Sequence, residues 1–219
     1  MDLNADFTAR AVVHAADIPW VASPIKGVDR RMLDRMGGEV ARATTIVRYA
    51  AGSAFSPHVH SGGEEYLVLS GTFQDEHGDF PTGSYVRNPP QSSHTPRSDD
   101  GAVIMVKLWQ FDMNDRTAVT LRPDDTTSVD GVTLLHHDDR ETVRIENWNA
   151  GADITIPDHG GAEVFVIAGG FSEAGEDFNV DSWLRLPVGA DLVAKAGKNG
   201  ARVWIKTGHL RVPPVAPNI

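Results

Sequence analysis

The chain has 219 residues and no cysteine, which excludes disulfides, thiolate catalysis and every metal site built on cysteine. Its 20 basic and 30 acidic residues give a formal net charge of −10, and no basic run interrupts the acidity, so we expect no binding to nucleic acid. No apolar run approaches the ~20 residues that span a bilayer, and the N-terminus lacks the basic-then-apolar order of a secretory signal. We therefore expect a cytoplasmic protein with no membrane partner, folded as one large domain or two small ones.

Short segments rich in Val, Ile and aromatic residues follow one another along the chain, separated by glycine and proline. One other segment, VDRRMLDRM (28–36), could be taken for a short helix stopped by Gly37 and Gly38. The other segments have the length of strands, so we expect an all-β protein. The expected strands, in chain order, are 42–49, 65–71, 84–88, 102–111, 163–169, 182–187 and 201–206.

The two halves of the chain repeat each other, at an offset of about 99 residues that falls to 98 after a one-residue deletion. The acidic, polar stretch 112–131 is the natural junction between them. Each half is large enough for one small barrel, and we expect domains at 1–118 and 119–219. The pairs that support the repeat include His60 with His159, Glu64 with Glu163, Phe73 with Phe171, Tyr85 with Trp183 and Arg87 with Arg185.

Three histidines and a glutamate in the first half have the spacing of a metal site. His58 and His60 are two residues apart, so on a strand their side chains leave the same face. Gly62-Gly63 then allows a tight reversal before a carboxylate, and His94 follows after a strand and a proline corner. Three imidazoles and one carboxylate suit a divalent ion of Zn, Fe, Mn or Ni that keeps an open position for water or a ligand.

Either Glu64 or Glu65 could supply the carboxylate, because the strand that follows is apolar at every position and hides its own parity. The repeat pairs Glu64 with Glu163 and places Glu65 opposite Val164, which favours Glu64. We therefore expect one divalent metal ion per chain, held by His58, His60, Glu64 and His94.

The second half lacks two of these ligands. Pro157 and Leu192 stand where His58 and His94 would be, and only His159 and Glu163 remain. Two ligands on a rigid sheet make a weak site, so we expect a degenerate second barrel without metal.

Some residues of the first half are candidates for lining a cavity beside the metal. Aromatic and methionine side chains in such strands more often belong to the core. Tyr85 and Arg87 also have counterparts in the repeat, and both pairs could serve the fold instead. The pocket candidates are Phe73, Tyr85, Arg87, Met105 and Trp109.

The positions of these residues resemble the two motifs of the cupin superfamily. The first motif is matched by Gly52, His58, His60, Glu64 and Gly71, and the second by Gly83, Pro89 and His94, with Gln91 and Ser98 where glycine and asparagine are common. Nearly the whole chain is similar to the bicupins, and about 60 residues of its first half look most like the cupin domain of ChrR-type anti-sigma factors. The resemblance implies two tandem cupin barrels, each a double-stranded β-helix or jelly roll, with the metal inside the first.

The resemblance implies two alternative functions, both with a small-molecule ligand. In ChrR-type proteins the cupin is a sensor of oxidative signals, attached behind a helical zinc-binding domain that holds the sigma factor. We find no such domain here, which argues against direct binding of a sigma factor. Cupins with three His and one Glu also include oxygenases of dicarbonyl or phenolic ketone substrates, so a metal-dependent dioxygenase or another small-molecule enzyme is the alternative, although no general base stands out. Exposed β edges would permit a homodimer.

Overall fold

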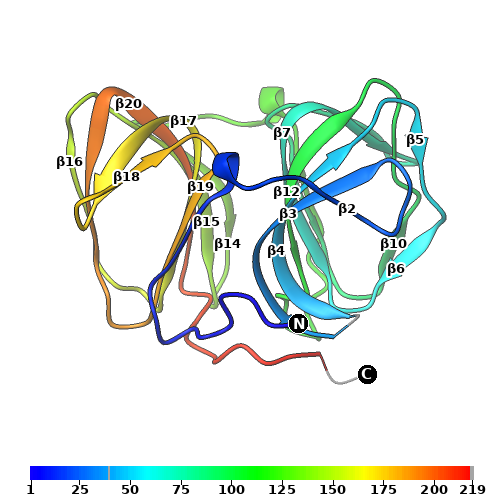
Figure 1. Ribbon diagram of the computed structural model, residues 1–219, viewed down its shortest axis with the longest axis horizontal. Coiled ribbons are helices and arrows are strands. Elements are labelled where there is room, and N and C mark those ends of the chain that lie inside the picture. Colours follow the sequence, from blue (N-terminus) through cyan, green and yellow to red (C-terminus); the bar gives the residue numbers. More distant parts are fainter. Residues whose placement is uncertain (39, 218–219) are drawn as a thin grey trace. The chain divides into compact units, whose positions relative to one another are not determined.

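The protein, described here by a computed structural model over residues 1–38 and 40–217, consists of β-strands and two 3-10 helices of three residues each (Figure 1). The expectation of an all-β protein is confirmed. The strands form two compact units, one built mainly from residues 19–125 and the other from residues 6–18 and 126–214. None of the described helices is long and apolar enough to cross a membrane.

The first unit is formed by a 10-stranded sheet whose main path is β13-β9-β7-β12-β4-β3-β2, and by a separate two-stranded sheet of β10 and β6. Its core surrounds Tyr66, Phe73 and Ile104, each at most 1% exposed. Helix η2 (Pro123–Asp125) follows the last strand. The strands are β2 (Val21–Ala22), β3 (Val28–Gly37), β4 (Ala41–Tyr49), β5 (Ser53–Ala54), β6 (His58–His60), β7 (Glu64–Asp75), β8 (Gly78–Pro81), β9 (Tyr85–Asn88), β10 (Ser92–His94), β11 (Arg97–Ser98), β12 (Ala102–Leu108) and β13 (Val119–Leu121).

The second unit is formed by an 8-stranded sheet with the path β1-β19-β17-β20-β15-β14, to which β16 and β18 add at β20 and β17. Its core surrounds Val164, Phe178 and Val203. Helix η1 (Ala15–Asp17) follows the first strand. The strands are β1 (Ala11–His14), β14 (Val132–His137), β15 (Thr142–Trp148), β16 (Asp153–Ile156), β17 (Ala162–Glu173), β18 (Glu176–Asn179), β19 (Ser182–Leu186) and β20 (Leu192–Thr207).

The segment 28–36 is a strand and not a helix. It forms most of β3, which pairs antiparallel with β4 from Val28 opposite Tyr49 to Gly37 opposite Ala41. The pairing with β4 and the burial of Val28 and Leu33 hold the segment in an extended conformation. Tertiary pairing outweighs the weak local preference.

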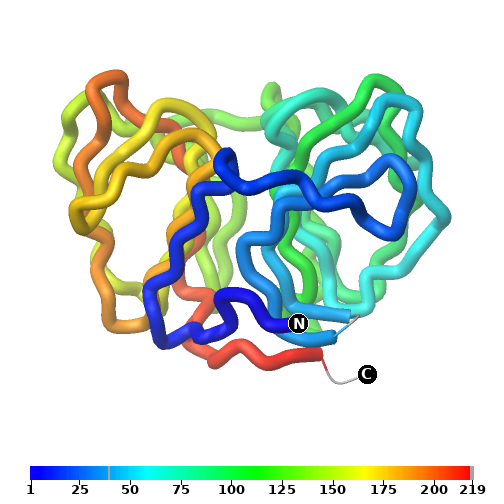
Figure 2. Tube along the Cα trace, in the orientation of Figure 1, coloured from blue at the N-terminus to red at the C-terminus, as the bar shows by residue number. Residues whose placement is uncertain are grey.

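The unit boundary also differs from the expected one at residue 118. Strand β13 pairs with β9 and therefore belongs to the first unit. The N-terminal residues 6–18 belong to the second unit, where β1 pairs with β19, as the blue segment in Figure 2 shows. A short strand at the edge of a sheet carries no signal for which sheet it joins, so the junction could not be placed to the residue.

Candidate metal centre

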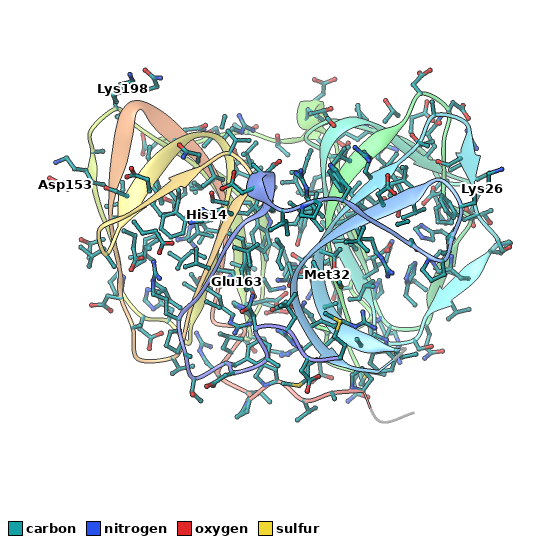
Figure 3. The ribbon with its side chains drawn as sticks, viewed as in Figure 1. His14, Lys26, Met32, Asp153, Glu163 and Lys198 are labelled. Carbon is teal, nitrogen blue, oxygen red and sulfur yellow. The ribbon has the colours of Figure 1, made fainter. Side chains whose placement is uncertain are left out.

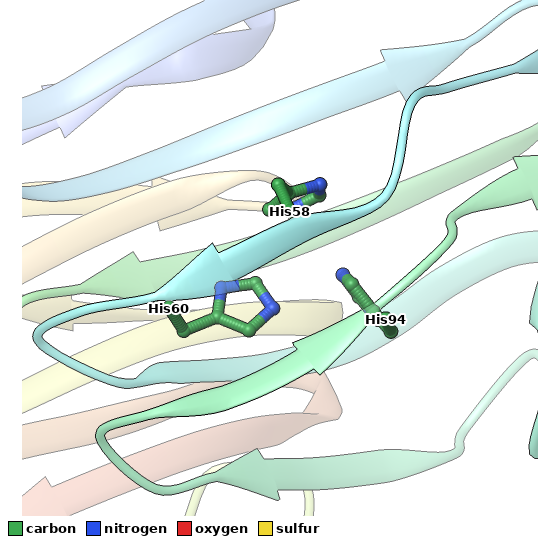
Figure 4. Close-up of side chains that lie close together, drawn as sticks. All are labelled: His58, His60 and His94. Carbon is green, nitrogen blue, oxygen red and sulfur yellow. The ribbon is translucent and has the colours of Figure 1, made fainter.

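The three predicted histidines lie together in the first unit, on the β6–β10 pair (Figure 4). The antiparallel register places His94 of β10 directly opposite His58, and His60 leaves the same face of β6 two residues further on. Their ring centroids are 4.6 to 5.0 Å apart. One ring nitrogen of each lies within 4.8 Å of the others, so the cluster could hold a metal ion.

In two of the three rings, a hydrogen bond to one nitrogen determines that the other nitrogen has a lone pair available for a metal. Nδ1 of His58 lies 3.2 Å from the carbonyl oxygen of Ser56, and Nδ1 of His94 lies 3.1 Å from Oδ2 of Asp75. Since a carbonyl and an ionised carboxylate only accept hydrogen bonds, both Nδ1 atoms carry the proton and leave the Nε2 lone pairs free. Nε2 of His60 and Nε2 of His94 are buried without a hydrogen-bond partner among the described residues. Buried polar atoms of this kind are unfavourable unless something binds them, and a divalent cation fits these lone pairs.

The carboxylate of Glu64 completes this arrangement. Its Oε2 lies 3.4 Å from Nε2 of His60 and 3.6 Å from Nε2 of His94, and the side-chain amide of Asn88 donates to the same oxygen. Glu65 leaves the opposite face of β7, where its Oε1 accepts a hydrogen bond from the Tyr85 hydroxyl at 2.8 Å. The structure thus brings Glu64, and not Glu65, to the imidazoles.

The reason for preferring Glu64 was nevertheless wrong. Glu65 lies opposite Arg87 and Lys107 in the first unit, and Glu163, labelled in Figure 3, lies opposite Arg185 and Lys206 in the second. Glu163 is therefore the counterpart of Glu65. The counterpart of Glu64 is Ala162, because the one-residue deletion precedes this strand instead of following it.

The same shift changes the other counterparts in the second unit. Leu192 pairs with Ile156 as His94 pairs with His58, so Ile156 and not Pro157 takes the place of His58. Asp158 takes the place of His60, but its carboxylate accepts hydrogen bonds from three backbone N–H groups. His159 is exposed. Apolar side chains fill this barrel where the first one has its ligands.

Burial and charge act differently on the two buried imidazoles. Burial lowers the pKa of His60. The charge of Glu64 raises it, and the neighbouring imidazoles lower it, so that the pKa of His60 is lowered overall. Burial disfavours the His94 cation as well, but the hydrogen bond to Asp75 and the nearby carboxylates outweigh it, so the pKa of His94 is raised. Burial raises the pKa of Asp75 too, yet its hydrogen bonds from His94 and the His77 amide lower the value overall. Asp75 is therefore ionised at neutral pH and orients His94.

A cavity of about 660 Å³ lies against this cluster, and its wall includes His58, His60 and Glu64. Of the predicted pocket residues, Trp109 lines it. The indole of Trp109 packs so closely on Gly62 that a Cβ at this glycine would overlap the ring. The glycine pair thus makes room for the cavity wall as well as for the turn.

The other four pocket candidates do not line this cavity. Phe73 lies in the barrel core, with its ring centroid 6.0 Å from that of His94. Tyr85, Arg87 and Met105 alternate with the core residues and face the other side of the sheet. There Arg87 pairs with Asp115 at 2.7 Å and lies over the ring of Phe111. Their strands are buried on both faces, so the pattern of apolar residues in the sequence could not show which face lines the cavity.

Sequence reasoning missed Asp75, Asn88 and the cavity residues Arg30 and Tyr49. Asp75 ends β7, and Asn88 ends β9 at a position opposite Glu64. The contact between Glu64 and Asn88 could have been predicted only if the register between their strands had been known. No spacing in the sequence indicated Asp75, Arg30 or Tyr49. Burial, with a contribution from the charge of Glu64, raises the pKa of Tyr49, so this hydroxyl stays protonated.

Comparison with known proteins agrees with this architecture. Residues 8–112 match the family model of the ChrR cupin-like domain, which confirms the resemblance seen in the first half. The bacterial pirin YhhW from Escherichia coli, solved in complex with nickel(II), is 14% identical with a TM-score of 0.69, covering 94% of this chain and 100% of that one.

Two further solved structures share the fold. Protein Ylba from Escherichia coli is 12% identical with a TM-score of 0.71, covering 94% of this chain and 93% of its own. A deletion mutant of oxalate decarboxylase OxdC from Bacillus subtilis is 11% identical with a TM-score of 0.63, covering 90% and 76%. No curated protein matches the chain. These likenesses establish the fold and confirm the prediction of two tandem barrels of the cupin type.

Proposed function

We propose that the first barrel binds one divalent first-row transition metal ion through Nε2 of His58, His60 and His94 and the carboxylate of Glu64. The observation that carries this proposal is the pair of buried, unpartnered Nε2 atoms of His60 and His94 beside that carboxylate. Three neutral imidazoles and one carboxylate form the kind of ligand set that such ions favour. The nickel(II) complex of the pirin, whose barrels share this fold, supports the choice of a divalent metal.

The chain's own residues prepare the centre for a small ligand. Asp75 and the Ser56 carbonyl hold two rings in the tautomer that presents Nε2, and Asn88 holds Glu64. The exposed ring of His58 lies at the cavity wall together with Trp109. A bound metal ion would supply Lewis acidity and an open coordination position to a molecule in this cavity.

Two roles fit such a centre. The match to the ChrR cupin-like domain supports a sensor that responds to an oxidant or a small ligand. The cavity of about 660 Å³ in contact with the ligand set supports the alternative, a metal-dependent enzyme acting on a small oxygenated substrate such as a dicarbonyl or phenolic ketone.

Metal content tests the first proposal. Mass spectrometry on protein purified without a tag or added metal, and again after reconstitution, should give one divalent ion per chain. His94→Ala should lose the ion, whereas His159→Ala, at an exposed position in the second unit, should keep it. No binding after reconstitution with Zn, Fe, Mn or Ni would remove the site, and two ions per chain would contradict a single centre.

Turnover separates the two roles. Steady-state oxygen uptake with a small dicarbonyl or phenolic ketone, abolished in His94→Ala, would contradict a pure sensor. Stoichiometric metal release by peroxide or singlet oxygen, without turnover of any such substrate, would contradict the enzyme.

A further inference from the structure

The cavity beside the metal centre contains one cationic side chain that the metal site does not use. Arg30 lies on β3 opposite Val47 of β4, and it is the only lysine or arginine among the described residues that line the cavity. It lies two residues after Val28, a core residue that also lines the cavity, so both side chains leave the same face of β3. Arg30 therefore presents a positive charge to the interior.

Arg30 has no acceptor of its own among the described residues. Its Nε is buried without a hydrogen-bond partner, and no ion pair joins it to a described carboxylate. Arg48 on the neighbouring strand differs in this respect, because its guanidinium pairs with Asp29 at 2.7 Å. The acid in the cavity wall, Glu64, is directed at His60, His94 and Asn88. A buried guanidinium nitrogen without an acceptor is unfavourable, which points to an acceptor supplied by a ligand.

Most of the remaining wall is apolar. A single guanidinium presents two parallel N–H donors that match a planar carboxylate. No second lysine or arginine lies in the described wall to balance a dianion such as a phosphate monoester, and the chain carries a net charge of −10. The apolar residues of the cavity wall include Ile25, Val28, Val47, Phe55, Leu108 and Trp109.

We propose that the cavity binds a small organic monocarboxylate with an apolar body, its carboxylate on Arg30 and its far end toward the histidine cluster. The position of the far end rests on the proposed metal-binding function, whereas the contact with Arg30 does not. The ligand class is thereby narrowed to an aryl-substituted or branched aliphatic acid.

The test compares 3-phenylpropanoate with its neutral amide, 3-phenylpropanamide, by isothermal titration calorimetry on the full chain, with 4-methylpentanoate as a second acid. Wild-type protein should bind the acid about tenfold to a hundredfold more tightly than the amide, as expected for charge-assisted hydrogen bonds. Arg30→Gln should lose this preference while binding the amide unchanged, and Arg30→Lys should keep part of it. Arg48→Gln, at a paired guanidinium outside the described cavity wall, is the matched control and should behave as wild type.

Several results would overturn the proposal. One is equal binding of acid and amide by wild type, another is an unchanged preference in Arg30→Gln, and a third is no binding of either acid at millimolar concentration. Circular dichroism and thermal melting verify that each variant is folded. If Arg30→Gln does not fold, protection of wild-type Arg30 from phenylglyoxal by 3-phenylpropanoate, but not by its amide, gives the same decision by peptide mass spectrometry.

Repeating the titrations on metal-free wild type and on the zinc-reconstituted protein separates this proposal from the proposed function. An acid preference that depends on Arg30 in a protein that binds no metal would leave the carboxylate site standing and remove the metal centre. Zinc binding without any acid preference would do the reverse.

Discussion

At the scale of single residues, two carboxylates that are adjacent in sequence, Glu64 and Glu65, have different surroundings. Glu64 faces the imidazoles, and Glu65, its neighbour in sequence, is hydrogen-bonded to Tyr85 on the other face of β7. Both are buried, at 7% and 1% exposure. Burial alone therefore does not distinguish a metal ligand from a structural residue, and the face of the strand does.

Glu64→Gln should weaken metal binding far more than Glu65→Gln. The first change removes a negative charge beside the cation, an effect we expect to exceed the tenfold to hundredfold loss, in order of magnitude, that follows from changing a residue behind a ligand. The second leaves the centre intact and should instead lower the melting temperature, because it removes a buried negative charge that lies opposite Arg87 and Lys107. Competition titration with a chromophoric chelator measures both affinities. Greater metal loss in Glu65→Gln would show that the wrong face of β7 has been assigned to the centre.

Asp75 should act on the proposed metal site through His94. Its hydrogen bond and charge contribute to the raised pKa of His94, and protons compete with the metal for this ring. Because the ordinary pKa of histidine is about 6.5, the competition at His94 begins above that pH as the solution is acidified. Metal affinity should therefore begin to fall at a pH above about 6.5 and fall further as the solution is acidified.

Asp75→Asn should lower metal affinity at pH 8 by about tenfold to a hundredfold. It should also move the onset of proton competition to lower pH, because the charge that raises the pKa of His94 is gone. Chelator titrations from pH 5 to 8 measure both effects. Asp79→Asn, at an exposed acid of the adjacent strand β8, is the control. A wild-type affinity and pH profile in Asp75→Asn would mean that Asp75 does not orient the ligand.

At the scale of strands, the two units share a glycine near the middle of two equivalent 12-residue strands, β7 and β17. Gly71 of β7 and Gly169 of β17 both have positive φ, at 73° and 69°. A Cβ at either position would overlap the carbonyl oxygen of a glycine, Gly101 in one unit and Gly200 in the other. Only glycine permits both the left-handed conformation and this close approach.

Gly71→Ala should destabilise the fold by more than its backbone conformation alone requires. Gly52 has a similar φ of 74° but open space around its Cβ position, so Gly52→Ala measures the cost of the left-handed conformation, about 1–2 kcal/mol. The overlap at Gly71 should add about 1–3 kcal/mol. Urea unfolding of the two variants gives the difference. Equal free energies of unfolding would mean that the carbonyl of Gly101 moves aside without penalty.

Local sequence patterns correctly predicted those strands and candidate ligands whose positions depend on short-range geometry. The two-residue spacing of His58 and His60 required only that they lie on a strand, and the structure places them with His94 as expected. It was harder to predict which face of β7 carries the candidate ligand, because the strand is buried on both faces from Glu64 to Val68. Asp75 reaches His94 only through the path of the folded chain, and no local pattern carries that information.

At the scale of the whole molecule, one barrel carries the proposed ligand set and the other has apolar side chains at the positions equivalent to Glu64 and His94. The equivalents of Glu64 and His94 in the second unit are Ala162 and Leu192, both in its core cluster. Each unit also has a hydrophobic core of its own. A ligand that binds only the folded state stabilises what it binds, by about 2.7 kcal/mol at a free concentration a hundredfold above Kd.

Metal addition should therefore slow amide hydrogen exchange in the first unit far more than in the second. The largest protection is expected at β6, β10 and the start of β7, which carry the four ligands. Hydrogen exchange followed by mass spectrometry, with and without the ion found by metal analysis, measures this along the chain. His94→Ala serves as the control and should show no response to the ion. Protection of equal size in β16 and β17 would contradict this prediction. It would mean that the second barrel responds to the metal as strongly as the first, although its core is apolar.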